Sequence, residues 1–283
     1  MEIKPTILGE LEGLEIRTHG FRLIVITQIG PRIAWFSKPD GDKLLYWATE
    51  GAGRGQWRLY GGHRVWLTRP LADESEDTYQ PDNAPCAVAL LPDGVDVCAP
   101  APDSNRIARG MEIRVLDESR VQVRNYLRNE GTMLYSGGCW SPTCVVADKP
   151  MEIPLGSAEP NPTWDIVYMA LPRVFAGNVT ALADDSAAFA GDALVLTPKG
   201  RCVKRCVRAE KGIIQLRCDG YVFRKTVPFD PGARYPMNGC NIAAFIGENN
   251  WMAEMETYGG ERTIKPGQAI DHAEQWELLG END

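Results

Sequence analysis

Two acidic residues near the C-terminus are spaced so that they could act on one ligand. Glu254 and Glu256 lie in the run Trp251–Tyr258. If this run is extended, alternate side chains project to opposite faces, so both carboxylates share one face with Met252. The spacing therefore predicts a strand that presents two acids to a ligand. The simpler alternative is that they mark an exposed strand end.

A second segment, Tyr60–Pro70, gathers side chains that suit a sugar. Two glycines precede His63, so the backbone can bend sharply and approach a ligand closely. An acid, two cations and an aromatic face are then supplied by His63, Arg64, Arg69 and Trp66. Sugar hydroxyl groups need polar partners, and the apolar face of a pyranose packs on an aromatic ring. The segment therefore predicts a carbohydrate site, unless Trp66 is a core residue and His63 caps a turn.

Few other residues compete for acid–base or metal chemistry. The three histidines stand at positions 19, 63 and 272, so a general acid with a near-neutral pKa comes from a short list. His272 and Glu274 would share a strand face, where we expect an ordinary surface pair. Cys202 and Cys206 lack a second pair or nearby histidines, which argues against a zinc site. We expect no metal and no cofactor.

The overall charge excludes two classes of partner. The chain of 283 residues has a formal net charge of −8, whereas nucleic acids and anionic membranes require a dense cationic surface. Its longest apolar stretches, such as 23–26 and 242–246, fall far short of the roughly 20 residues of a membrane helix. The N-terminus lacks the basic and apolar regions of a secretory signal. We therefore expect a cytoplasmic protein that binds a small molecule; its oligomeric state is not predicted.

The elements that must position these residues are strands. Extended runs alternate with turn signals, and Asp93-Gly94 and Asp219-Gly220 are typical of hairpins. No window of about 12 residues has a helical stripe with caps. A strand spacing of about 8 to 12 residues favours a large antiparallel sandwich or barrel. The sequence therefore predicts one all-β domain over residues 1–283.

The order of short motifs along the chain resembles that of a known superfamily. The motifs are Gly30-Pro-Arg-Ile33, Asp40-Gly-Asp-Lys-Leu-Leu-Tyr46, Tyr60-Gly-Gly-His-Arg-Val-Trp66, Asn129-Glu-Gly131, Tyr235-Pro-Met-Asn-Gly239, Glu254-Met-Glu256, Pro266-Gly267 and Trp276. Together they resemble the galactose mutarotase-like (aldose 1-epimerase) superfamily, and within it an epimerase-like branch. The resemblance implies a supersandwich of antiparallel strands that binds carbohydrate on a concave face.

The resemblance also implies roles for individual residues. In the active mutarotases a glutamate on a late strand is the general base at the anomeric hydroxyl, which places Glu256 in that role and Glu254 as the fallback. His63 is then the general acid. The second histidine of the active mutarotases is missing, because the segment Ser136–Thr143 has Trp140 in that neighbourhood. Substrate contacts are expected from Arg32, Arg64, Trp66, Trp140, Asp219 and Tyr235. Tyr235, Asp219 or a water held by Arg32 could substitute for the missing acid.

The leading prediction is thus a cofactor-independent aldose epimerase or mutarotase. Two alternatives remain open. One is a non-catalytic sugar-binding or sensing protein, which the missing histidine favours. The other is a carbohydrate lyase or hydrolase, which would need a third carboxylate, such as Asp219 or Glu248, across the groove from the paired acids.

Overall fold

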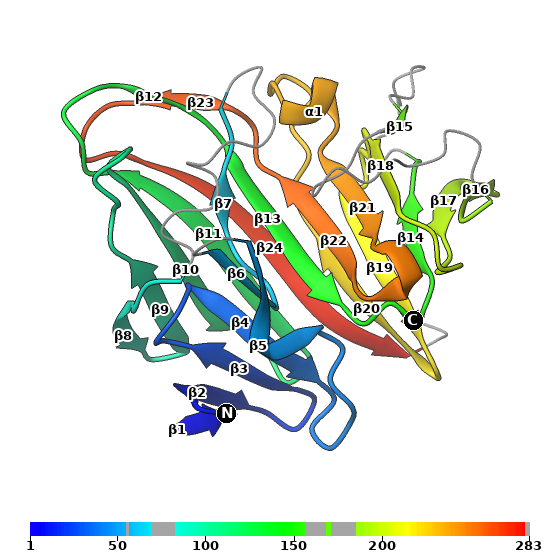
Figure 1. The fold of residues 1–283 in the computed structure, drawn as a ribbon, viewed down its shortest axis with the longest axis horizontal. Helices are drawn as coiled ribbons and strands as arrows, with labels where there is room; N and C mark the ends of the chain where they lie inside the picture. Colours follow the sequence, from blue (N-terminus) through cyan, green and yellow to red (C-terminus); the bar gives the residue numbers. More distant parts are fainter. Residues whose placement is uncertain (55–56, 70–82, 157–167, 171–184, 281–283) are drawn as a thin grey trace.

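Antiparallel strands build the protein. The computed structural model describes residues 1–54, 57–69, 83–156, 168–170 and 185–280 (Figure 1). Within these ranges, helix is confined to the single turn α1 (Pro236–Gly239) and a 3-10 turn at Glu248–Asn250. The all-β prediction is therefore confirmed, and both predicted hairpins form, between β8 (Ala87–Leu91) and β9 (Gly94–Ala99) and between β19 (Ile213–Cys218) and β20 (Tyr221–Thr226). None of the described helices is long and apolar enough to cross a bilayer.

One layer is a ten-stranded antiparallel sheet. In spatial order it contains β16 (Ala187–Ala190), β17 (Ala193–Leu196), β14 (Met151–Pro154), β19 (Ile213–Cys218), β20 (Tyr221–Thr226), β24 (Ala269–Gly280), β11 (Arg120–Asn129), β10 (Ile107–Val115), β9 (Gly94–Ala99) and β8 (Ala87–Leu91). The long strand β24 lies near its centre and pairs with β11 and β20.

The second layer has two parts. A six-stranded sheet contains β15 (Tyr168–Ala170), β18 (Val203–Val207), β21 (Ile242–Ile246), β22 (Ala253–Tyr258), β13 (Cys139–Val145) and β7 (Trp66–Leu67). A four-stranded sheet contains β1 (Glu2–Leu8), β2 (Leu11–Arg17), β3 (Arg22–Ile26) and β4 (Arg32–Ser37). The backbone of His63 joins the two parts, because it bridges to Ile33 of β4 on one side and to Thr143 of β13 on the other.

Two short ribbons complete the described strands. They are β5 (Trp47–Arg54) with β6 (Trp57–Gly61), and β12 (Tyr135–Gly137) with β23 (Arg262–Ile264). Side chains from the facing sides of the two layers form one buried apolar cluster that extends from Ile16 to Trp276. At its centre the ring of Phe36 lies 5.1 Å from Phe223 and 5.4 Å from Trp276. Such aromatic pairs add about 0.5–1.5 kcal/mol each beyond the area they bury.

Alternation along the strands decides which residues enter this core. In β22 the side chains of Met255 and Thr257 face the ten-stranded sheet, while Glu254 and Glu256 face away from it. The outward side of the six-stranded sheet is called the outer face below. The predicted shared face of the two glutamates is therefore correct, and Tyr258 continues the same side.

Candidate functional site

The outer face holds a compact group of acids, cations and aromatic rings. Antiparallel register places Trp140 opposite Tyr258, Pro142 opposite Glu256 and Cys144 opposite Glu254. Side chains directly opposite each other share a face, so residues 116 positions apart meet at the centre of the sheet. The register thus brings Trp140 beside the carboxylate of Glu256.

The carboxylate of Glu256 is held by two hydrogen-bond donors and one ion pair. The Trp140 Nε1–H donates to Oε2 at 2.9 Å, and the Tyr258 hydroxyl donates to the same oxygen at 2.7 Å. The Lys204 ammonium of β18 lies 3.0 Å from Oε1. Glu256 has no exposed surface, so these partners replace the water that an ionised carboxylate would otherwise need. The arrangement fixes the position of the acid.

Glu254 forms a second acid–cation pair on the same face. Its Oε1 accepts a hydrogen bond from Arg64 Nη2 at 3.0 Å and one from the Cys144 thiol at 3.3 Å. Burial raises the pKa of Glu254, and the nearby charge of Glu256 adds to the effect. The two acids therefore differ in their surroundings, and the better-held carboxylate is that of Glu256.

Aromatic rings border the two ion pairs. Trp66 meets Trp140 edge to face with centroids 5.0 Å apart, and Trp140 stacks on Tyr258 at 6.0 Å. The Arg64 guanidinium lies 4.1 Å from the centroid of Trp66, and Lys204 lies 5.1 Å from that of Trp140. Aromatic faces beside a few convergent polar groups are the usual composition of small-molecule sites.

His63 does not belong to this group, and the expectation that it faces Glu256 is wrong. Residues 63 to 67 continue the register of β7 against β13, so His63 projects into the core while Arg64 and Trp66 project outward. Its Nδ1 lies 2.8 Å from Thr143 Oγ1 and its Nε2 lies 3.1 Å from Asn125 Oδ1. Burial lowers the pKa of His63 to about 4, although Glu274 acts in the opposite direction. Because His63 points into the core, on the opposite side of the sheet from Glu256, the two residues cannot act together on one substrate.

The glycines before His63 serve the neighbouring backbone and not a ligand. Gly62 has a φ of +70°, and a Cβ at this position would lie 2.3 Å from the carbonyl oxygen of Ile33. Gly61 has a φ of +101° and packs equally close to the carbonyl oxygen of Tyr46. Gly61 and Gly62 therefore let the chain turn sharply, so that the following residue, His63, lies between β4 and β13.

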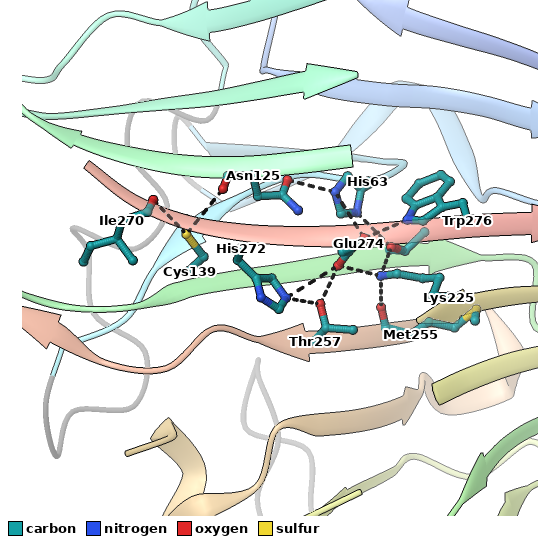
Figure 2. A network of polar contacts seen from close by, with 11 residues as sticks. His63, Asn125, Cys139, Lys225, Met255, Thr257, Ile270, His272, Glu274 and Trp276 are labelled. Carbon is teal, nitrogen blue, oxygen red and sulfur yellow. Dashed lines mark hydrogen bonds and ion pairs between the residues drawn. The ribbon is translucent and has the colours of Figure 1, made fainter. Parts of the chain in front are cut away.

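His63 is part of a buried polar cluster between the two layers, shown in Figure 2. We name this cluster the interlayer network and define it as His63, Asn125, Thr143, Lys225, Thr257, His272, Glu274 and Trp276. Lys225 Nζ lies 3.1 Å from Glu274 Oε1, and Trp276 Nε1 donates to Glu274 Oε2 at 2.7 Å. Thr257 donates to Glu274 and lies 2.8 Å from His272 Nε2. The expected surface pair of His272 and Glu274 is therefore wrong, because β24 turns both residues into the core.

Burial and the ion pair between Lys225 and Glu274 determine the protonation of the interlayer network. Burial alone would raise the pKa of Glu274, but Lys225 and the other neighbours outweigh it and lower the pKa to about 2. Burial lowers the pKa of Lys225, against the influence of Glu274. Burial also lowers the pKa of His272 to about 4. At neutral pH the network is thus an ion pair flanked by two neutral histidines.

Three other residues that were predicted to contact the substrate make contacts within the protein instead. Arg32 is buried and donates to Gly61 O at 3.1 Å and to Asn83 Oδ1 at 2.8 Å, which ties β4 to the end of β6. Tyr235 accepts a hydrogen bond from the backbone of Asp230 and stacks on Phe229. Asp219 is exposed at the β19–β20 turn, in the other layer, where it pairs with Lys149 at 2.7 Å. The structure therefore does not support the expectation that Asp219 and Tyr235 contact the substrate.

Sequence reasoning missed three members of the outer face. Lys204 stands beside a second cation, Arg205, in the strand Val203–Val207, and no motif marks either Lys204 or the buried thiol of Cys144. Tyr258 continues the alternation of Glu254 and Glu256 and could have been found from that signal. Among the described residues, no group of three or more His, Cys, Asp or Glu side chains is placed to hold a metal.

The two packed antiparallel layers and the acid-bearing central strand define a β-supersandwich of the galactose mutarotase-like type. Solved structures agree with this assignment over nearly the whole chain. A galactose mutarotase-like protein from Lactobacillus casei superposes with a TM-score of 0.63 at 10% identity, covering 94% of this chain and 99% of its own. One from Clostridium acetobutylicum gives a TM-score of 0.61 at 8% identity, covering 99% of both chains.

A third solved structure has the same fold. A galactose mutarotase related enzyme from Lactobacillus acidophilus gives a TM-score of 0.58 at 10% identity, covering 95% of this chain and 97% of its own. No protein-family model matches the sequence, and neither does any curated protein. At such low identities the likeness establishes the fold, which confirms the predicted galactose mutarotase-like supersandwich.

Proposed function

We propose that the outer face binds a small carbohydrate and that the protein interconverts the anomers of an aldose or sugar derivative, with Glu256 as the general base. The observation that carries this proposal is the fixed carboxylate of Glu256 between Trp140, Tyr258 and Lys204. Its position on a late strand agrees with the role that the sequence resemblance implies. Arg64 and Trp66 lie on the same face and would orient the sugar.

The acid in this proposal is Lys204 in place of His63. Opening an aldose ring requires a base at the C1 hydroxyl and an acid at the ring oxygen, and both oxygens are bonded to C1. Lys204 Nζ and Glu256 Oε1 are 3.0 Å apart, so a cation and a carboxylate lie side by side and could each reach one of these two oxygens. Each positioned acid or base typically contributes about 10² to 10⁴ in rate.

Glu256 and Lys204 together account for both proton transfers of the reaction. Glu256 takes the proton of the C1 hydroxyl while Lys204 gives a proton to the ring oxygen, and the bond between C1 and the ring oxygen breaks to leave an open-chain aldehyde. Rotation about the bond from C1 to C2 exposes the other face of the carbonyl. Reversal of both proton transfers closes the ring as the other anomer and restores the enzyme.

A sugar-binding protein without catalysis is the second candidate. The full set of donors on Glu256 favours it, because a substrate hydroxyl must replace one of them before a proton can be transferred. A lyase or hydrolase is less well supported. Glycosidase carboxylates flank the scissile bond from opposite sides, whereas Glu254 and Glu256 project from one face of one strand.

Exchange between anomers, followed by NMR over a panel of aldoses and sugar phosphates, tests the proposal. The wild type is expected to accelerate exchange of at least one sugar, and Glu256→Gln and Lys204→Met are each expected to lower the rate by about 10² or more. Asp219→Asn is the matched control, because it neutralises an exposed acid in the other layer and should leave the rate unchanged.

Binding is measured on the same panel by the chemical shifts of the tryptophan indole groups. Sugar-dependent shifts without accelerated exchange in the wild type would replace the epimerase by the sugar-binding protein. Equal exchange rates in the wild type and both variants would remove Glu256 and Lys204 from the mechanism.

A further inference from the structure

Lys225 crosses from one layer to the other directly behind Glu256. It belongs to β20 of the ten-stranded sheet, yet its Nζ donates to Thr143 Oγ1 at 2.7 Å. The same Nζ donates to the carbonyl oxygen of Met255 at 3.2 Å, as Figure 2 shows. Thr143 of β13 and Met255 of β22 are register partners. One ammonium group therefore holds together the two strands that carry Trp140 and Glu256.

Lys225 holds these two strands together directly beside Glu256, the proposed base. The pair next to Thr143 and Met255 in the ladder is Pro142 and Glu256. Met255 lies between Glu254 and Glu256, so its carbonyl is part of the backbone that orients both glutamates. A shift of this carbonyl would move Glu256 relative to Trp140 and Lys204.

The stability of the core does not by itself explain why position 225 carries a charged side chain. Lys225 and Glu274 are both fully buried, and replacing a buried ion pair by apolar residues of similar size is often neutral or stabilising. Packing of the core thus does not require an ammonium here. The ammonium also interacts electrostatically with Glu256, across the single strand that separates them.

We propose that Lys225 is a positioning residue for Glu256, holding the backbone of β22 where the Glu256 carboxylate meets Trp140 and Lys204. The inference rests on the proposed function only in giving this positioned carboxylate a catalytic use. Removal of the ammonium group is then expected to move the Met255 carbonyl and to weaken the hydrogen bond from the Trp140 indole to Glu256.

The charged groups around these residues determine what else could move the Glu256 carboxylate. On the outer face of the described structure Glu256 faces Lys204 and Tyr258, with Glu254, Arg64 and Cys144 beyond them. Behind the strand, Lys225 is surrounded by Glu274, His63 and His272. The variants that remove Lys225 leave all the outer-face groups unchanged.

The test reads the Trp140 indole N–H, which donates to Glu256, by ¹H,¹⁵N NMR at constant pH. The signal is assigned from its loss in Trp140→Phe. In Lys225→Met the proton resonance of this N–H is expected to move upfield, because its hydrogen bond to Glu256 becomes longer. In Lys225→Met/Glu274→Gln, which leaves no unpaired charge in the core, it is expected to move in the same direction by less. If the single variant does not fold, this double variant carries the test.

Met255→Ala is the structural control. It opens a cavity behind β22 without removing the ammonium group of Lys225, so it should lower stability and leave the Trp140 resonance close to its wild-type position. The proposal is overturned if a folded variant without Lys225 keeps the wild-type Trp140 resonance, or if Met255→Ala moves it equally. This measurement needs no sugar and no turnover. A failure of the anomer-exchange experiment therefore contradicts the proposed function and leaves this result standing.

Discussion

Acid is expected to destabilise the protein through the two buried histidines of the interlayer network. Burial lowers the pKa values of His63 and His272 from 6.5 to about 4 in the folded state. The unfolded chain therefore binds protons first as the pH falls below 6.5, while the folded protein stays neutral at both sites. Stability contributed by the neutral histidines is complete above pH 6.5 and is lost as the pH falls towards 4.

The size of the effect follows from the number of protons. Each proton that binds only to the unfolded state changes the free energy of unfolding by about 1.4 kcal/mol per pH unit, so two histidines give a slope of about 2.7 kcal/mol per pH unit in the middle of the window. Over the whole window the loss approaches about 7 kcal/mol, which is comparable with the total stability of many domains.

Urea unfolding at several pH values measures this slope. His272→Gln cannot take up a proton at this position, so its slope should fall by about half, whatever the change in absolute stability. His19→Gln is the control, because His19 is exposed and should leave the slope at its wild-type value. Burial raises the pKa of Glu254, so its contribution has the opposite sign and is lost as the pH rises. Comparing variants at each pH cancels this contribution.

The reasoning is refuted by either of two results. One is a slope in His272→Gln that is steeper than in the wild type, which would mean that His272 binds its proton more tightly in the folded protein than in the unfolded chain. The other is an unchanged slope in His272→Gln, which would mean that this histidine is already protonated in the folded protein.

Two further variants test the packing that positions the site. Gly62→Ala is expected to lower the free energy of unfolding by about 3 kcal/mol or more, because its Cβ would lie 2.3 Å from Ile33 O at a φ of +70°. Gly220→Ala is the control, since Gly220 has a φ of +78° and open space around it, and it should lower the free energy of unfolding by only about 1–2 kcal/mol. Urea unfolding measures both changes. Trp276→Phe removes the indole donor to Glu274 and should cost about 1.5–3 kcal/mol at neutral pH; a change below about 0.5 kcal/mol would show that this hydrogen bond is dispensable.

The fold could be predicted from the sequence because strand signals are local. Period-two patterns and turns such as Asp93-Gly94 depend on neighbouring residues, and they led to antiparallel strands where the structure has them. The alternation that puts Glu254 and Glu256 on one face is a property of any extended chain. These features do not require knowledge of which strands are neighbours.

The candidate site was predicted less well, for two different reasons. His63, Arg64 and Trp66 were grouped because they are close in sequence, although an extended backbone separates His63 from the other two. That error could have been avoided by applying the same alternation that was applied to Glu254 and Glu256. Lys204 could not have been found in this way, because its contact with Glu256 depends on β18 and β21 lying beside β22.

The sequence by itself determined the strands and the face on which each of their side chains projects. Tertiary structure alone decided that Trp140 and Lys204 meet Glu256, and that Lys225 of the opposite layer reaches the carbonyl of Met255. It also decided that Glu274 is a core residue, since the pattern of β24 shows which residues share a face but not which face is covered. The physical reason is that strand pairing and layer packing join residues far apart in the chain, whereas local patterns carry information only about their own strand.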